Sequence, residues 1–220
     1  MIGSLFRAFG GLGDPRMRRY IWISVVGAIA IFILLWIGIW MLLSQSVITT
    51  IPWLDTVIDV FGGLAVLVLS WLLFPGIIGL ISGVLLEGVA AAVEARDYPH
   101  LAPARDQGWI EIIRTTAKFA GIVVLGNLVA LPLYLIPGVN IVVFYTLNGY
   151  LLGREYFELV ALRRLDETAA RDLRRRGRGR WFVAGLAIAF LMTIPVLNLF
   201  MPIIATAFMV HLFQATGSHA

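Results

Sequence analysis

The pattern of apolar and polar residues in this 220-residue chain is dominated by long apolar runs, two of which are interrupted near their centres by proline. Residues 119–152 are broken at Pro137, and residues 181–213 are broken at Pro195. Because proline removes a backbone donor and clashes with the preceding helical turn, a helix that arrives at either proline is predicted to end there. The chain becomes apolar again directly after each break, so the pattern predicts two helical hairpins whose turns lie in or near lipid.

The arms of these hairpins are short for membrane spans. At about 1.5 Å per residue, residues 119–136 reach roughly 27 Å and residues 139–152 roughly 21 Å, whereas the hydrocarbon core of a bilayer is about 30 Å thick. Arms of this length favour partly penetrating hairpins, whose turns are tolerated beside protein or a water-filled cavity and often mark a permeation site. A pair of thin antiparallel spans joined by a structural proline turn is the alternative.

Two further apolar runs, residues 20–43 and 61–86, are long enough to span a bilayer, and Trp22, Trp36 and Trp40 in the first of them are typical interfacial anchors. Hydrophobic residues make up 60% of the chain, far more than a soluble domain of this size needs. The sequence therefore predicts an all-α integral membrane protein. We expect a single membrane domain over 1–220, with two long transmembrane helices and two proline-broken hairpins.

The positive charges are confined to three segments. All 17 Lys and Arg residues fall within 1–19, 96–118 and 154–180, and none lies in the loop 44–60. By the positive-inside rule, both termini and these three segments are predicted to be cytoplasmic, and the loop is predicted to face outward. Residues 1–19 are expected to form a basic amphipathic head.

Residues 154–180 carry acidic and basic side chains four positions apart. The pairs are Arg154 with Glu158, Arg163 with Glu167, Glu167 with Arg171, and Asp172 with Arg176. This spacing predicts a solvated, salt-bridged helix that extends from the first hairpin. Its arginine-rich end is more typical of contact with anionic lipid than with nucleic acid, so no nucleic-acid partner is expected.

Motifs for enzyme chemistry are absent from the sequence. It has no cysteine, no phosphate-binding glycine loop with a lysine, no histidine pair at metal-ligand spacing and no Gly-x-Ser-x-Gly turn. We therefore expect no catalytic residues, no metal site, no cofactor and no enzyme activity.

A few polar residues lie within or beside the apolar runs. Asn140 and Asn198 each follow a hairpin proline, Pro137 or Pro195, by three positions, and Glu87 lies at the edge of the run 61–86. In a membrane, such residues line a polar path or satisfy backbone groups that are freed at a proline turn, and the sequence leaves both interpretations open.

A third candidate is the arginine pair Arg18 and Arg19, which follows Asp14-Pro15 at a predicted helix start. Backbone N–H groups at a helix start and adjacent guanidinium groups can bind an anion. From spacing alone, an effect of this pair on membrane topology is the favoured explanation, because arginines beside a span fix its orientation.

The chain resembles the CysZ-type sulfate permeases of bacterial inner membranes, which belong to the broader etoposide-induced-protein domain family. The resemblance rests on four motifs in the same order and spacing: Pro15-x-x-Arg18-Arg19-Tyr20, Val93-Glu94-Ala95-Arg96, Tyr134-Leu135-Ile136-Pro137-Gly138-Val139, and Met192-Thr193-Ile194-Pro195-Val196-Leu197-Asn198-Leu199-Phe200. It implies two long membrane helices, two partly penetrating helix pairs and a homo-oligomer. It also implies a sulfate site at Leu12, Gly13, Arg18 and Arg19.

Two functional hypotheses follow. The first is an inner-membrane permease or channel for sulfate or a related small oxyanion that supplies sulfur assimilation, in which Arg18 and Arg19 collect the anion and the hairpin turns at Pro137 and Pro195 frame the path. The second is a structural or regulatory membrane protein that transports nothing and binds anionic lipid or a partner through its arginine-rich helix.

Overall fold

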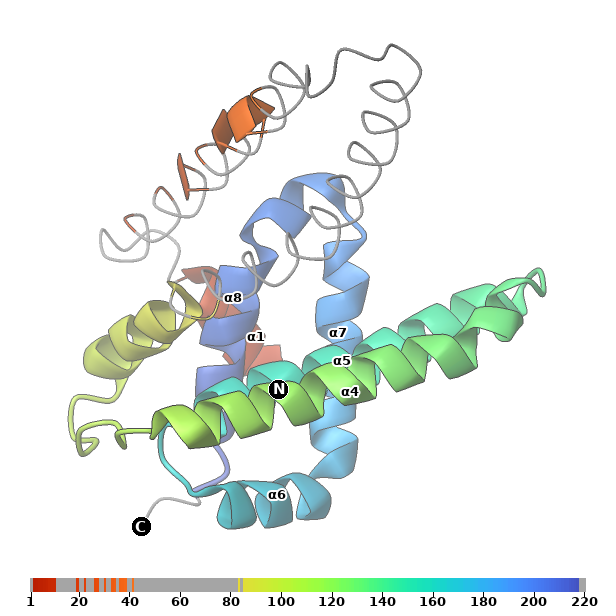
Figure 1. The fold of residues 1–220 in the computed structure, drawn as a ribbon. Coiled ribbons are helices and arrows are strands. Elements are labelled where there is room, and N and C mark those ends of the chain that lie inside the picture. Colours follow the sequence, from red (N-terminus) through yellow and green to blue (C-terminus); the bar gives the residue numbers. More distant parts are fainter. Residues whose placement is uncertain are drawn as a thin grey trace. The chain divides into compact units, whose positions relative to one another are not determined.

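The computed structural model describes residues 2–10 and 85–217, together with Gly83 and residues 19, 22, 26–27, 30, 33–34, 36–38 and 41 (Figure 1). The chain divides into two compact units, one comprising Met1–Met17 with Leu86–Ala220 and the other Arg18–Leu85. The described residues form helices, turns and loops with no strand among them, which confirms the predicted all-α class.

In the second unit, the described residues of the predicted span 20–43 are helical. Trp22, Leu34 and Trp36 among them are 63%, 67% and 68% exposed, as expected of a helix whose apolar side chains face lipid. The predicted loop 44–60 and almost all of the predicted span 61–86 lie outside the described residues. The prediction of two spanning helices therefore stays a prediction.

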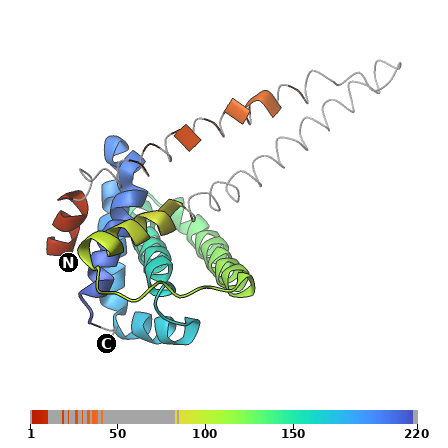
Figure 2. The ribbon, with the colours of Figure 1, turned by 90° about the vertical axis from the view of Figure 1, so that its left-hand side faces the viewer.

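The first unit is built from helices around a central group of three, α5, α7 and α8, each of which contacts the other two. Helix α1 lies on α8, and α4 lies along α5 (Figures 1 and 2). The helices are α1 (Ile2–Gly10), α4 (Trp109–Tyr134), α5 (Val139–Ala161), α6 (Glu167–Arg176), α7 (Arg178–Met192) and α8 (Pro195–Gln214), and residues 86–97 are also helical. Helix α8 is buried along most of its length, whereas α4 is largely exposed.

Helix α4 is longer than the first hairpin arm that the sequence predicts. It runs without a break from Trp109 through the predicted arm to Tyr134, so its 26 residues extend roughly 39 Å. In the part of the chain that the structure describes, it is the helix that is long and apolar enough to cross a membrane. Because residues 109–118 contain neither proline nor glycine, nothing separates them from the apolar arm, and the short-arm argument does not hold for α4.

Both predicted helix breaks are present. Helix α4 ends at Tyr134 and α5 begins after Gly138, whose φ of 83° lies in the left-handed region that glycine adopts without strain. Helix α7 ends at Met192 and α8 begins at Pro195, a position where the missing N–H costs no helical hydrogen bond. The two breaks coincide with Pro137-Gly138 and Pro195, whereas Pro132 and Pro202 lie within α4 and α8. The depth of the two turns in a membrane stays a prediction.

The closest helix contact in the first unit is the crossing of α5 and α7. Gly149 and Gly153, four residues apart on α5, face Gly185 on α7. A Cβ atom on Gly185 would lie 1.9 Å from the carbonyl oxygen of Gly149 and 2.4 Å from the amide nitrogen of Gly153. Small residues at this spacing let two helix backbones touch, an arrangement typical of helix pairs in membranes.

Aromatic side chains extend the core beside this crossing. The ring of Phe157 on α5 lies 4.5 Å from that of Trp181 on α7 and 6.1 Å from that of Phe213 on α8. All three side chains are buried, so their packing stabilises the contact between the three central helices.

The region 154–180 differs from the single helix that the sequence predicts. Helix α5 ends at Ala161, α6 begins after Asp166, and Gly177 separates α6 from α7. The side chain of Asp166 accepts a hydrogen bond from the backbone N–H of Ala169 at 2.8 Å, which starts a new helix in place of continuing the old one. Capping chemistry therefore overrides the charge periodicity along this stretch.

Candidate functional site

The asparagines at the helix breaks have different surroundings. The side-chain Oδ1 of Asn140 accepts a hydrogen bond from the N–H of Ile141 at 2.8 Å, and its own N–H donates to the carbonyl of Ile136 at 3.1 Å. The side chain of Asn198 is exposed, and its backbone N–H donates to the carbonyl of Ile194 at 2.8 Å. Asn140 thus satisfies a backbone N–H at the start of α5, while a role of either asparagine in a polar path stays a prediction.

The two turns do not meet within one chain. Pro137 and Pro195 are both exposed, and Figure 1 shows the turn between α4 and α5 well apart from the turn between α7 and α8. The structure therefore does not bring Asn140 and Asn198 into one site in the monomer.

The predicted anion site near the N-terminus falls largely beyond what the structure describes. Leu12, Gly13 and Arg18 lie outside the described residues, and Arg19 is helical and exposed. The role of these four residues in binding sulfate stays a prediction.

The structure shows a buried cluster of charges that links helical residues 86–97 to the end of α5. The carboxylate of Glu94 accepts hydrogen bonds from Arg163 Nη2 at 3.0 Å and from Arg164 Nη2 and Nε at 2.6 and 3.2 Å. The side chains of Glu94 and Arg163 are each only 6% exposed. Charges buried to this extent are stable only when paired, so we call this group the Glu94 cluster and regard it as a fixed point of the fold.

Three further contacts extend the Glu94 cluster, two of them to the loop after residue 97. Arg164 Nη1 donates to the carbonyl of Ala102, and the N–H of Arg105 donates to the carbonyl of Arg163 at 2.8 Å. On the other side, Arg163 Nη1 donates to Glu87 at 3.1 Å. The loop, the helical residues 86–97 and the end of α5 are therefore held together by hydrogen bonds to two neighbouring arginines.

Glu87 differs from Glu94 in how firmly it is held. Its side chain is 64% exposed and, within the part of the chain that the structure describes, makes one hydrogen bond, to Arg163. The Nε of Arg163 is buried without a hydrogen-bond partner among the described residues. An exposed carboxylate on a buried arginine is the part of the Glu94 cluster that an incoming anion could replace, because the other carboxylate is enclosed. Glu87, which the sequence places at the edge of an apolar run, thus lies beside a buried cation.

The side chain of Arg163 does not pair as the sequence spacing predicts. It contacts Glu87 and Glu94 in place of Glu167, because it lies beyond the end of α5 and four-residue spacing has meaning only within one helix. Two other predicted pairs form, Arg154 with Glu158 and Glu167 with Arg171, both at 2.8 Å. The family-like motif Val93-Glu94-Ala95-Arg96 was the sequence signal that could have identified Glu94.

A second polar group fixes the loop against α8. His211 Nδ1 lies 3.0 Å from the hydroxyl oxygen of Tyr98, and His211 Nε2 lies 3.5 Å from the carboxylate of Asp97. Arg96 donates two hydrogen bonds to Asp97, at 2.8 and 2.7 Å, and thereby holds the pKa of that carboxyl below its usual range. Within the described residues no three His, Asp or Glu side chains converge as a metal site. The contacts of His211 connect Asp97 and Tyr98 to α8.

Comparison with known proteins identifies one family. The sequence model of the family described as sulfate transporter CysZ/etoposide-induced protein 2.4 matches residues 4–202. This range includes the Glu94 cluster and both helix breaks. Among curated proteins, no significant sequence match to the chain is found.

Proposed function

Because the chain belongs to the sulfate transporter CysZ/etoposide-induced protein 2.4 family, we propose that it is a permease or channel for sulfate or a related small oxyanion. The observation that carries this proposal is the family match, which extends over nearly the whole chain. The exposed apolar surface of α4 supports a location in a membrane, since Leu125, Leu128 and Leu131 are each more than 60% exposed. Transport in this proposal needs no chemical reaction and no cofactor.

The proposed location is the bacterial inner membrane, with both termini in the cytoplasm. The confinement of Lys and Arg to three segments supports this orientation. Residues 20–43 and 61–86 would be the spanning helices of a single membrane domain. The helix pair broken at Pro195 would penetrate part of the bilayer, whereas α4, in the pair broken at Pro137, is long enough to cross it. Since the two turns lie apart in one chain, a shared path between them requires a homo-oligomer, which we include in the proposal.

In the proposed path, Arg18 and Arg19 collect the anion beside Leu12 and Gly13, because guanidinium groups near a membrane surface concentrate oxyanions. Arg163 offers a second contact for the anion. An arriving oxyanion would displace the exposed carboxylate of Glu87 from Arg163, while the enclosed Glu94 keeps the arginine in place. Binding at such a site is reversible because Glu87 returns when the anion leaves.

The test compares sulfate flux into proteoliposomes for three proteins. Replacing both Arg18 and Arg19 by alanine should reduce the flux of the wild type severely, and unchanged flux would refute the assignment of these residues. Glu87→Gln should lower the half-saturating sulfate concentration, because the amide competes poorly for Arg163. A higher half-saturating concentration would contradict the exchange at Arg163.

The second hypothesis from the sequence, a membrane protein without transport activity, predicts a different result in the same preparation. Such a protein would bind anionic liposomes in a salt-sensitive manner through its arginine-rich region and would give no flux above that of empty vesicles.

A further inference from the structure

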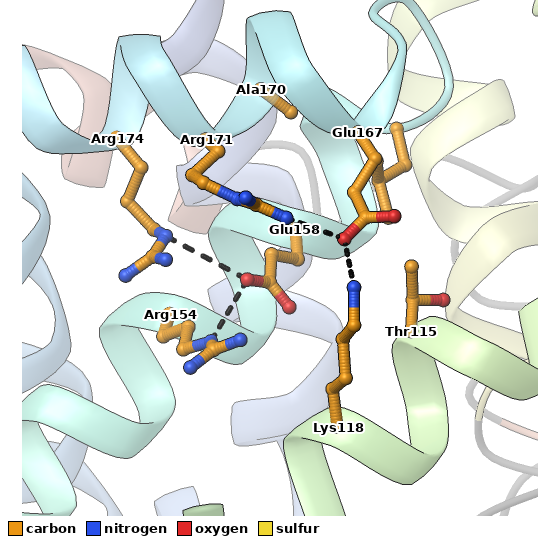
Figure 3. Close-up of a pocket in the computed structure, with 9 residues that line it drawn as sticks. Thr115, Lys118, Arg154, Glu158, Glu167, Ala170, Arg171 and Arg174 are labelled. Atoms are coloured by element: carbon orange, nitrogen blue, oxygen red, sulfur yellow. Dashed lines mark hydrogen bonds and ion pairs between the residues drawn. The ribbon is translucent and has the colours of Figure 1, made fainter. Parts of the chain in front are cut away.

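A small cavity lies where α4, α5 and α6 meet, and it shares no residue with the Glu94 cluster (Figure 3). Its volume is about 50 Å3. A cavity volume of roughly 10–15 Å3 is enough for one water molecule, so this cavity has room for a small polyatomic ion. Its charged lining consists of Lys118 from α4, Arg154 and Glu158 from α5, and Glu167, Arg171 and Arg174 from α6. We call this the α4–α6 pocket.

On one side of the α4–α6 pocket, two arginines share a single carboxylate oxygen. Oε1 of Glu158 accepts a hydrogen bond from Arg154 Nε at 2.8 Å and lies 3.6 Å from Arg174 Nε (Figure 3). One negative charge therefore faces two positive charges whose side chains are only 11% and 21% exposed. Partly buried like charges repel, and one carboxylate cannot neutralise both arginines.

The other side of the α4–α6 pocket repeats this imbalance. Oε1 of Glu167 accepts from Lys118 Nζ at 2.5 Å and from Arg171 Nη2 at 2.8 Å. Taken with the first side, four cations surround two carboxylates, which leaves a surplus of two positive charges around the cavity. That surplus equals the charge of a sulfate dianion.

Hydrogen-bond donors are also left over in the α4–α6 pocket. Arg154 and Arg174 turn only Nε toward Glu158, so their terminal Nη atoms donate to no acceptor in the described part of the chain. Arg174 Nε is buried and, at 3.6 Å from Glu158, is itself without a hydrogen-bond partner there. Guanidinium groups with free terminal nitrogens bind tetrahedral oxyanions through paired hydrogen bonds.

The same two arginines line a neighbouring hollow of about 50 Å3 together with Arg178 and Trp181. The indole Nε1 of Trp181 is buried and has no hydrogen-bond partner among the described residues. The region around Arg154 and Arg174 therefore offers donors on both sides and few acceptors, which is the pattern expected where an anion supplies the acceptors.

We propose that the α4–α6 pocket binds a tetrahedral oxyanion, a sulfate or phosphate group that is either free or part of a lipid headgroup. Arg154 and Arg174 donate through their terminal nitrogens, and Lys118 and Arg171 supply charge from the opposite side. This site is separate from the permeation path proposed above and binds its ligand whether or not the protein transports sulfate.

The test titrates the purified full-length chain, in a neutral detergent at low salt, with sodium sulfate and with inorganic phosphate by calorimetry. Arg174→Gln should weaken binding by about tenfold or more, the size expected for one charge-assisted hydrogen bond. The matched control is Arg175→Gln, which removes the same charge from an exposed position on the same helix outside the pocket. It should change the affinity by less than about twofold, since exposed charges are screened.

Glu158→Gln should change the affinity for sulfate in the opposite direction to Arg174→Gln. Removal of this carboxylate frees both arginines, so sulfate should bind more tightly than in the wild type. A purely structural role of the charges predicts the reverse, because the lost ion pairs would loosen the pocket. If Arg174→Gln fails to give a single thermal transition, Arg171→Gln replaces it, since that side chain is 46% exposed.

A second arm identifies the source of the oxyanion. The same variants are placed in nanodiscs of phosphatidylcholine with and without phosphatidylglycerol, and retained lipid is counted by native mass spectrometry. If Arg174→Gln weakens binding in the titration, the ligand is a free anion. If Arg174→Gln reduces the amount of phosphatidylglycerol retained in the nanodiscs, the ligand is a lipid headgroup. Equal behaviour of Arg174→Gln and Arg175→Gln in both arms would overturn the site. Because neither arm measures flux, an absence of sulfate transport leaves this result intact.

Discussion

Replacing Gly185 by alanine should separate α5 from α7. The added Cβ would lie 1.9 Å from the carbonyl oxygen of Gly149 and 2.4 Å from the amide nitrogen of Gly153. Non-bonded heavy atoms normally stay about 3.5 Å apart, so the two helices would have to move roughly 1.5 Å away from each other. Both obstacles are backbone atoms, which cannot rotate out of the way as a flexible side chain would.

The size of the effect follows from two opposing contributions. Overpacking of this kind costs about 1–3 kcal/mol, and rigid obstacles place Gly185→Ala near the upper value. Alanine in a helix interior recovers up to about 1 kcal/mol relative to glycine. We therefore expect a net loss of about 2 kcal/mol in the free energy of unfolding.

Unfolding in mixed micelles of maltoside and dodecyl sulfate, followed by tryptophan fluorescence, measures this loss, because Trp181 is buried beside the crossing. The matched control is Gly121→Ala on α4, where an added Cβ meets no atom within 4 Å. It should leave the protein equally stable or raise its stability by up to about 1 kcal/mol. The reasoning is refuted if Gly185→Ala is as stable as Gly121→Ala.

Three further predictions concern the charged groups and the first turn. Glu94→Gln should lower the free energy of unfolding by about 3 kcal/mol, because it leaves Arg164 without a carboxylate and Arg163 with only the exposed Glu87. Glu87→Gln, at its exposed position, should cost less than about 1 kcal/mol in the same denaturation assay. Similar losses for both would contradict this prediction. Lys118 holds the pKa of Glu167 below its usual range, so this carboxylate stabilises the fold above pH 4.5 and the benefit is lost as the pH falls through the lowered pKa. Melting temperatures should therefore separate wild type from Glu167→Gln at pH 7 and converge in acid, and a constant gap would disprove it. Because the sequence has no cysteine, a cysteine at Val139 labelled by an impermeant reagent reports whether the first turn reaches outside water, and protection is expected if it stays within the bilayer.

The parts of the fold that the sequence predicts well are those decided by local chemistry. The breaks predicted at Pro137 and Pro195 are present, and Gly138 supplies the left-handed conformation that the first turn needs. The pair Arg154 and Glu158 lies within one helix, so its four-residue spacing is realised.

Predictions fail where the outcome depends on contacts distant in the sequence or on where a helix ends. Arg163 binds Glu94, 69 positions away, and no periodicity signals such a pair. The ion pair of Lys118 with Glu167 spans 49 positions and exists only because α6 folds back on α4. Asp166 caps a new helix, so Arg163 lies outside both α5 and α6 and pairs with Glu87 and Glu94 in place of Glu167.

The proposed permeation is tested most directly by uptake of radiolabelled sulfate into liposomes that contain the purified wild-type chain. The account predicts uptake that exceeds that of protein-free liposomes, saturates with sulfate concentration and falls when unlabelled sulfate competes. Uptake equal to that of protein-free liposomes, from a preparation shown to be folded by its cooperative thermal transition, would contradict it.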